Sequence, residues 1–202
     1  MEQLSFFDSD LQNPKLPVDL MDYRATFFSK AECDLLIPAL KANIEWNQET
    51  IQMYGKLLNQ PRLTAWYGDN GKTYAYSGKK YAPQPWTDEL LFIKSRVDYA
   101  AGVTFNSVLL NLYRNGNDSM AWHADDEPEL GVNPIIASVS FGQARRFHVR
   151  HKIDKKEKHS VELENGSLLI MKGDLQHQWE HQVPKSTKAL KERINLTFRV
   201  IN

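Results

Sequence analysis

The second half of the chain alternates apolar and polar residues in short runs, a pattern typical of half-buried β-strands. Turns rich in Gly, Asn and Lys separate six candidate strands, which are Ser107–Tyr113, Ile135–Phe141, Arg146–His151, Ser160–Leu163, Ser167–Lys172 and Arg193–Val200. The last strand is the most regular, because it places all its polar side chains on one face, namely Arg193, Asn195, Thr197 and Arg199. Such a strand either lies at a sheet edge with its polar face exposed to solvent or lines a polar pocket.

Two segments before residue 107 follow a helical pattern instead. A helix is expected to begin at Ser29, because Glu32 stands three residues later as in a capping box, and its apolar face would include Cys33, Leu36 and Leu40. A second helix should run from about Thr87 to a stop at Gly102. Residues 61–85 read as loops and short strands. Helices followed by many short strands predict an α+β fold, a jelly roll backed by N-terminal helices.

Length and composition bound the class of protein. The 202 residues, 42% of them apolar and 25% charged, suit one domain of a soluble globular protein, which we expect over 15–202 after a flexible tail at 1–14. No apolar run reaches the length of a membrane span, and the N-terminus does not resemble a secretory signal. A single cysteine, Cys33, excludes an internal disulfide and fits a reducing cytoplasm. We expect a cytoplasmic monomer that contacts no membrane.

Charge gives no strong pointer to a partner. The formal net charge is zero, whereas nucleic-acid binders usually carry a basic excess. Lysines do cluster at 152–158 and at 185–191, but each cluster is equally typical of a solvated loop.

A histidine and a carboxylate two residues apart suggest half of a metal site. In an extended segment, His123 and Asp125 would point to the same face. A second histidine could come from His177 or His181. Two histidines and one carboxylate that leave positions open are characteristic of non-haem iron(II) oxygenases. A zinc hydrolase is the competing interpretation, since zinc prefers a tetrahedral site.

The polar face of the last strand distinguishes these two metals. In Ser107–Tyr113, Asn111 and Tyr113 share a face with Leu109, so two strands could line one pocket with anion-binding donors. A dicarboxylate such as 2-oxoglutarate needs an arginine for its distal carboxylate and hydroxyl or amide donors beside it. A zinc hydrolase gives no role to the face that carries Arg193 and Arg199.

These motifs together resemble the AlkB family of dioxygenases. The order and spacing match in Asn111-x-Tyr113, His123-x-Asp125, His181 and Arg193-x-Asn195-x-Thr197-x-Arg199. The resemblance covers roughly residues 50–202, and two lid segments, Tyr54–Lys56 and Tyr67–Gly78, are similar to the duplex-DNA repair branch found in animal nuclei. It implies a double-stranded β-helix core at about 105–202 and a nucleotide-recognition lid at about 50–85.

The resemblance implies specific ligands for iron(II) and for the cosubstrate. Iron would be held by His123, Asp125 and His181, with His181 preferred to His177 because the family ligand follows the tryptophan by two residues. The residues implied for 2-oxoglutarate are Asn111, Tyr113, Arg193, Asn195 and Arg199, with Arg193 on the distal carboxylate.

Substrate contacts are also implied. Tyr76 would stack on a flipped base opposite His123, while the base edge or nearby backbone would be contacted by Tyr74, Asp126 and Glu127. Arg62 and Tyr54 would belong to the lid, Tyr54 as the finger that fills the gap in the duplex. Tyr54 and Tyr76 stand where that branch often has phenylalanine, and Ala124 replaces a basic residue, so strict duplex preference is not implied.

The implied activity is oxidative demethylation of 1-methyladenine- and 3-methylcytosine-type bases in double- and single-stranded DNA. The reaction would use O2, convert 2-oxoglutarate to succinate and release formaldehyde. Two alternatives stay open from the residues: the same chemistry on RNA or a protein side chain, and a non-catalytic nucleic-acid-binding jelly roll.

A further motif lies in the tail. Gln3-Leu4-Ser5-Phe6-Phe7 resembles the short peptide by which bacterial polymerases and repair proteins bind the sliding clamp. It suggests a bacterial cytoplasm and a clamp partner. The alternatives are a chance match and a tail that packs against its own domain.

Overall fold

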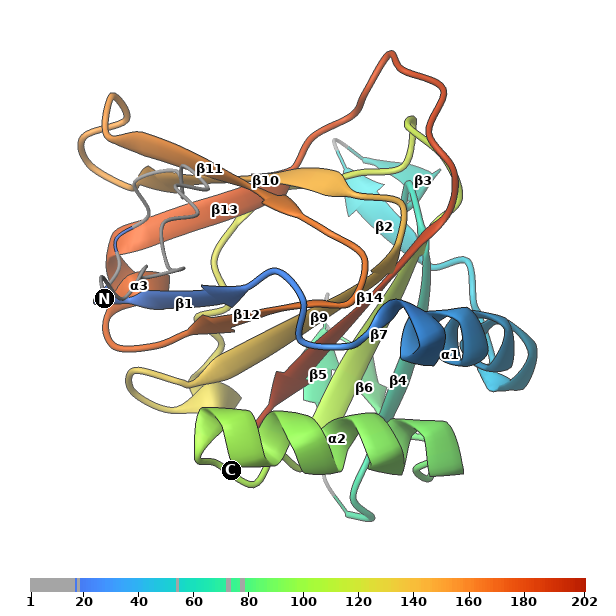
Figure 1. Cartoon of the computed structure of the whole chain (residues 1–202). Coiled ribbons are helices and arrows are strands. Elements are labelled where there is room, and N and C mark those ends of the chain that lie inside the picture. Colours follow the sequence, from blue (N-terminus) through green and yellow to red (C-terminus); the bar gives the residue numbers. More distant parts are fainter. Residues whose placement is uncertain (1–16, 18, 54, 72–73, 77–78) are drawn as a thin grey trace, which may run out of the picture.

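The computed structural model describes residues 17, 19–53, 55–71, 74–76 and 79–202 (Figure 1). The clamp-like segment Gln3–Phe7 and the finger residue Tyr54 lie outside the described residues. Within the described part of the chain, no helix is long and apolar enough to cross a membrane.

Both predicted helices form where their caps place them. Helix α1 (Lys30–Asn43) has Ser29 as N-cap, and the reciprocal capping box with Glu32 is present. Helix α2 (Asp88–Ala101) begins after Thr87, whose hydroxyl accepts from the amide of Leu90. It ends at Gly102, whose φ of 67° is the left-handed conformation that favours glycine. Two further short helices, η1 (Pro128–Leu130) and α3 (Leu175–Gln178), have no counterpart in the sequence prediction.

Two antiparallel sheets form the centre of the molecule. The larger sheet has the order β1 (Met21–Arg24), β12 (Ser167–Met171), β9 (Ile136–Gly142), β14 (Arg193–Arg199), β7 (Ser107–Tyr113) and β4 (Leu63–Gly68). The smaller sheet has the order β11 (Lys158–Leu163), β10 (Arg145–His151), β13 (Trp179–Val183) and β8 (Met120–His123). Figure 1 shows the two sheets facing each other, with α1 and α2 on the outer side of the larger sheet.

Two short hairpins complete the described elements. They pair β2 (Thr50–Met53) with β3 (Lys56–Asn59) and β5 (Tyr74–Tyr76) with β6 (Lys79–Tyr81). Both fall within the range expected for the lid, and neither pairs with either main sheet.

The larger sheet is buried on both faces, and a separate apolar core covers each face. The outer core joins the helices to β7, β9 and β14 through side chains such as Leu40, Ile93, Val108, Leu196 and Phe198. The inner core lies between the two sheets and includes Tyr113, Ile136, Phe147, Trp179 and Val183. Polar side chains that face inward therefore lie in an enclosed space.

Strand β14 shows this two-sided burial most clearly. It pairs with β7 on one side and with β9 on the other, and all its residues are buried. The alternative of an exposed sheet edge is therefore wrong for this strand. Its apolar residues pack towards the helices, and its polar residues face the smaller sheet.

Candidate active site

Strands β8 and β13 bring the three candidate metal ligands together. His123 is the last residue of β8, Asp125 follows it by two, and His181 is paired with His123 across the sheet. One ligand atom from each residue lies within 4.8 Å of the others. The His123 and His181 rings are 4.3 Å apart between centroids. Such an arrangement of two imidazoles and one carboxylate can hold one metal ion and leave coordination positions open.

Each ligand is oriented by a neighbouring polar group. The Nδ1 of His123 lies 2.9 Å from the carbonyl of Ala121, so an Nδ1–H donated there leaves Nε2 free for a metal. Asp125 receives a hydrogen bond of 2.7 Å at Oδ1 from Arg199 Nη2, and its backbone amide donates to Gln176 Oε1. Gln176 is buried, so this hydrogen bond is shielded from water and holds the loop that carries Asp125 in place.

The electrostatics of the cavity favour metal-binding protonation states. Burial alone raises the pKa of Asp125, but Arg199 in particular, with His181 and His123, lowers it to about 2. Burial, with the nearby His123, lowers the pKa of His181 to about 3. At neutral pH, Asp125 is therefore a carboxylate and His181 a neutral imidazole, which are the forms that coordinate metals.

His177, the alternative ligand, lies elsewhere. It is an exposed residue of α3, and its Nε2 accepts a hydrogen bond of 3.5 Å from the backbone amide of Asn133. The geometry therefore favours His181.

All eight residues predicted for iron and 2-oxoglutarate line one cavity between the sheets, of about 460 Å³. Arg193 is 1% exposed and donates from Nη2 to Ser140 Oγ. Its Nε and Nη1 have no hydrogen-bond partner among the described residues. Burial lowers the pKa of Arg193 to about 10, so it remains charged at neutral pH. A buried cation with two free donors is a suitable partner for a ligand carboxylate.

The other predicted cosubstrate residues differ in what they can offer a ligand. The Tyr113 ring lies 5.1 Å from the Arg193 guanidinium carbon and 5.4 Å from that of Arg145. Asn195 donates from Nδ2 to Ser138 and Val139 and accepts at Oδ1 from Thr197, so its amide is already occupied. Asn195 therefore stabilises the cavity wall.

The predicted substrate residues are not gathered in one place. Arg62 is 4% exposed and donates from Nε to Asn111 Oδ1 at 2.7 Å, so it contacts a residue that lines the first cavity. Asp126 is exposed and pairs with Lys152, and Glu127 is half-buried at the start of η1. Tyr74 and Tyr76 belong to β5, but their side chains lie outside the described part of the structure.

A second cavity of about 760 Å³ lies beside the first and shares Leu109 with it. Its lining includes Trp66 of β4, which is paired with Leu109, and polar side chains from the segments around β4, such as Glu45, Asn47, Arg62 and Gln84. An indole with amide and carboxylate groups around it can hold a flat, hydrogen-bonding ring.

Sequence reasoning missed several residues that line these cavities or contact their lining residues. Gln176 lies just before the predicted ligand segment, but no pattern signals its contact with Asp125. Ser138 of β9 lines the first cavity and Ser140 accepts a hydrogen bond from Arg193, but both lie among apolar residues, and only their alternation indicated a common face. Trp66 fell in a segment read as loops and short strands.

Comparisons with known proteins agree with this geometry. A family model described as "2OG-Fe(II) oxygenase superfamily" matches residues 21–199. The human "Alpha-ketoglutarate-dependent dioxygenase alkB homolog 3" is 42% identical over 184 residues, which cover 87% of this chain and 64% of the relative. The mouse "DNA oxidative demethylase ALKBH2" is 40% identical over 190 residues, covering 89% and 79% of the two chains.

A solved structure, "The structure of OsALKBH1", aligns with a TM-score of 0.65 and 21% identity over 89% of this chain and 97% of that one. This likeness supports the jelly-roll fold that the sequence predicted. The chain spans 64% of the length of the human alkB homolog 3 and similar shares of its bovine, rat and mouse counterparts.

A jelly roll that joins two histidines, an aspartate and a buried arginine in one cavity defines the class of iron- and 2-oxo-acid-dependent oxygenases. Within that class, the chain belongs to the AlkB family of the 2OG-Fe(II) oxygenase superfamily.

The residues present fit the two groups that the family implies. The triad supplies the ligand set that suits iron(II), and Arg193 supplies unpartnered buried donors for a carboxylate.

Proposed function

We propose that this chain is a monomeric iron(II)- and 2-oxoglutarate-dependent dioxygenase that removes N-alkyl groups from bases in DNA. The observation that carries the proposal is the joint cavity. It places the triad of His123, Asp125 and His181 in the same enclosed space as Arg193, two of whose buried nitrogens have no hydrogen-bond partner among the described residues. The names of the relatives, among them "DNA oxidative demethylase ALKBH2", support DNA as the substrate.

The proposed reaction divides the two atoms of O2 between 2-oxoglutarate and the substrate. One oxygen atom of O2 enters the carboxylate of succinate as 2-oxoglutarate loses CO2, and the other oxidises the N-methyl carbon, which leaves as formaldehyde. Bound iron(II) supplies the activation of oxygen. In the chain, His123, Asp125 and His181 would hold the metal, and Arg193 would hold the distal carboxylate. Arg199 keeps the Asp125 carboxylate in place and ionised.

The proposed substrates are bases methylated on the Watson–Crick edge, such as 1-methyladenine and 3-methylcytosine. Their reacting carbon is inaccessible in a duplex, so the base must be flipped out, at lower cost because the lesion pairs poorly. Both bases are cationic, and the carboxylates of Asp126 and Glu127, next to Asp125, would attract them. Tyr74, Tyr76 and the second cavity would hold the flipped base and its neighbours.

The experiment is a turnover assay on oligonucleotides of one sequence. The arms are DNA with 1-methyladenine, DNA with 3-methylcytosine, the matching RNA and unmethylated DNA, each with iron(II), 2-oxoglutarate and O2. We expect restored bases in the two methylated DNA arms, with equal amounts of succinate and formaldehyde. Turnover confined to RNA, or no base restored in any arm, contradicts the proposal.

We also propose that the segment Gln3–Phe7 binds a bacterial sliding clamp. This contact would place the enzyme on newly copied DNA in the bacterial cytoplasm. Leu4, Phe6 and Phe7 can insert into an apolar groove of the clamp, and tethering raises the local concentration of the enzyme. A peptide of residues 1–12 should bind the host's clamp saturably, and replacing Leu4 and Phe7 with alanine should remove the binding. Equal binding by the two peptides would contradict this proposal.

A further inference from the structure

The guanidinium of Arg62 contacts Asn111, a residue that lines the cavity proposed for the cosubstrate. It lies just before β4, whose Thr64 is paired with Asn111 of β7. The Arg62 guanidinium donates from Nε to Asn111 Oδ1 at 2.7 Å, and both side chains are less than 5% exposed. The bond is therefore shielded from water, where a charged donor contributes most.

This bond determines which end of the Asn111 amide faces the cavity. A primary amide has one acceptor oxygen and one donor nitrogen, and a guanidinium can only donate. Because Arg62 takes Oδ1, the Nδ2 donor is left for the cavity that Asn111 lines. A carboxylate there would accept from Nδ2, whereas a flipped amide would present its oxygen and repel the ligand.

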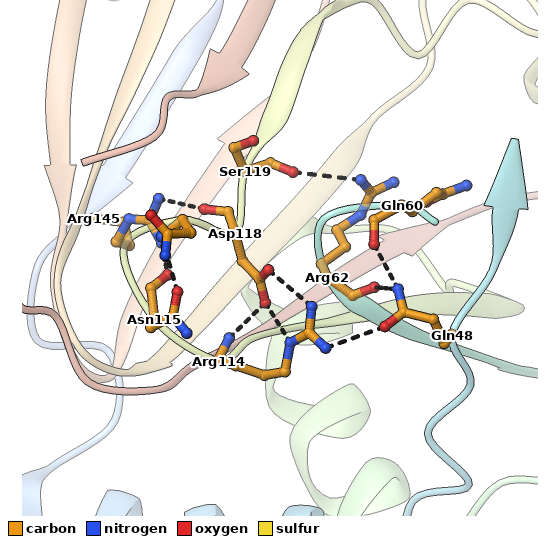
Figure 2. Close-up of polar contacts among 9 residues, drawn as sticks. Gln48, Gln60, Arg62, Arg114, Asn115, Asp118, Ser119 and Arg145 are labelled. Atoms are coloured by element: carbon orange, nitrogen blue, oxygen red, sulfur yellow. Dashed lines mark hydrogen bonds and ion pairs between the residues drawn. The ribbon is translucent and has the colours of Figure 1, made fainter. Parts of the chain in front are cut away.

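A polar network holds Arg62 in this position. Gln48 donates from Nε2 to the carbonyls of Gln60 and Arg62, and its Oε1 accepts from Arg114 Nη1 (Figure 2). Arg114 in turn forms an ion pair with the buried Asp118. Arg62 Nη1 also lies 3.5 Å from the carbonyl of Ser119. The network joins both ends of the β2–β3 hairpin to the β7–β8 connection, which leads to the metal ligands.

We propose that Arg62 is a positioning residue for 2-oxoglutarate, which acts by orienting the amide of Asn111 towards the cosubstrate. The inference rests on the proposed function, because it assumes that the cavity binds a 2-oxo acid. It gives Arg62 a role different from the substrate contact that the sequence suggested.

The test is a binding measurement on Arg62→Lys. Lysine keeps the charge and most of the stem but places a methylene where Nε stood, so it loses the bond to Asn111. Affinity for 2-oxoglutarate is measured by calorimetry on the folded, manganese(II)-loaded protein, without turnover. We expect about tenfold weaker binding, which corresponds to one hydrogen bond. The matched control is Arg146→Lys, a change at an exposed arginine of β10, which should bind like the wild type.

A double-variant cycle shows whether Arg62 acts through Asn111. If it does, Arg62→Lys should weaken binding no further in an Asn111→Ala background. Additive losses would overturn the proposal, and so would an Arg62→Lys variant with wild-type affinity. An Arg62→Lys variant that binds 2-oxoglutarate normally but DNA poorly would assign Arg62 to the substrate instead.

The same samples separate this inference from the proposed function. A wild-type protein that binds no 2-oxoglutarate contradicts both. A wild-type protein that binds it and restores methylated bases, beside an Arg62→Lys variant with unchanged affinity, contradicts the inference alone.

Discussion

Two arginines on the same face of β14 have different hydrogen-bond partners. Arg199 donates from Nη2 to the carboxylate of Asp125, and Arg193 donates from Nη2 to Ser140 Oγ. The two arginines are six residues apart in a strand, so their Cα atoms are about 20 Å apart. Their side chains therefore reach different parts of the cavity. Alternation predicted their common face, but only the fold shows which residue each of them contacts.

At this scale, Arg193→Ala should raise the KM for 2-oxoglutarate. Removing one side of a desolvated charge pair costs about 2–5 kcal/mol, which corresponds to at least roughly thirtyfold. The measurement is initial rate against 2-oxoglutarate concentration, with Arg146→Ala, at an exposed position, as control. An unchanged KM would remove Arg193 from the binding site.

A second prediction concerns Gln176, which binds the backbone amide of Asp125. Gln176→Ala should weaken iron(II) binding by about 10–100-fold, because outer partners of metal ligands contribute that much to affinity. Metal titration of the apoprotein measures it, and the exposed neighbour Gln178 provides the control variant Gln178→Ala. If both variants bind iron(II) equally well, Gln176 has no part in positioning Asp125.

At the scale of elements, the sequence predicted those with strong local signals. Both helices were predicted because their caps are explicit, and β14 because its alternation is unbroken. Strands β8 and β13 were missed, although they carry the two histidines. β8 is short and mostly half-exposed, while in β13 the buried His181 interrupts the apolar face. Functional residues weakened the very pattern that would have revealed their strands.

The outer face of β14 packs against the two segments that flank α2. The Phe198 ring packs 6.0 Å from Phe105 and 6.5 Å from Trp86, between centroids, and is fully buried. Phe198→Ala should lower the free energy of unfolding by about 3–5 kcal/mol, measured by urea denaturation. The control is Phe92→Ala on α2, where the ring is 46% exposed and the change should be below about 0.5 kcal/mol. Equal effects would show that this contact does not hold the layers together.

At the scale of the whole molecule, the order of the strands within the two sheets could not be predicted from the sequence. Strand β14, the last in the chain, lies between β9 and β7, and β8 pairs with β13 across more than fifty residues of sequence. Local patterns carry no information about such partners. The family resemblance supplied the jelly roll, and through it the association of Asn111 and Arg193 in one cavity.

The finger role expected for Tyr54 leads to a prediction about the complex with DNA. Tyr54→Ala should impair repair of a duplex more than repair of the same single strand, because only the duplex leaves a gap to fill. Stacking in that gap contributes about 1–3 kcal/mol per base. The measurement compares kcat/KM on the two forms of one methylated oligonucleotide. An equal loss of kcat/KM on both forms would contradict the finger role, because filling the gap matters only in a duplex.

The most direct test of the central claim compares His181→Ala with His177→Ala. For each variant and the wild type, restored base, succinate and formaldehyde are quantified in one reaction on DNA that contains 1-methyladenine. His181→Ala should abolish all three products, because it removes one of three protein ligands, whereas His177→Ala, at an exposed position, should retain them in equal amounts. An active His181→Ala variant, or a wild type that forms succinate without restoring the base, would contradict the account.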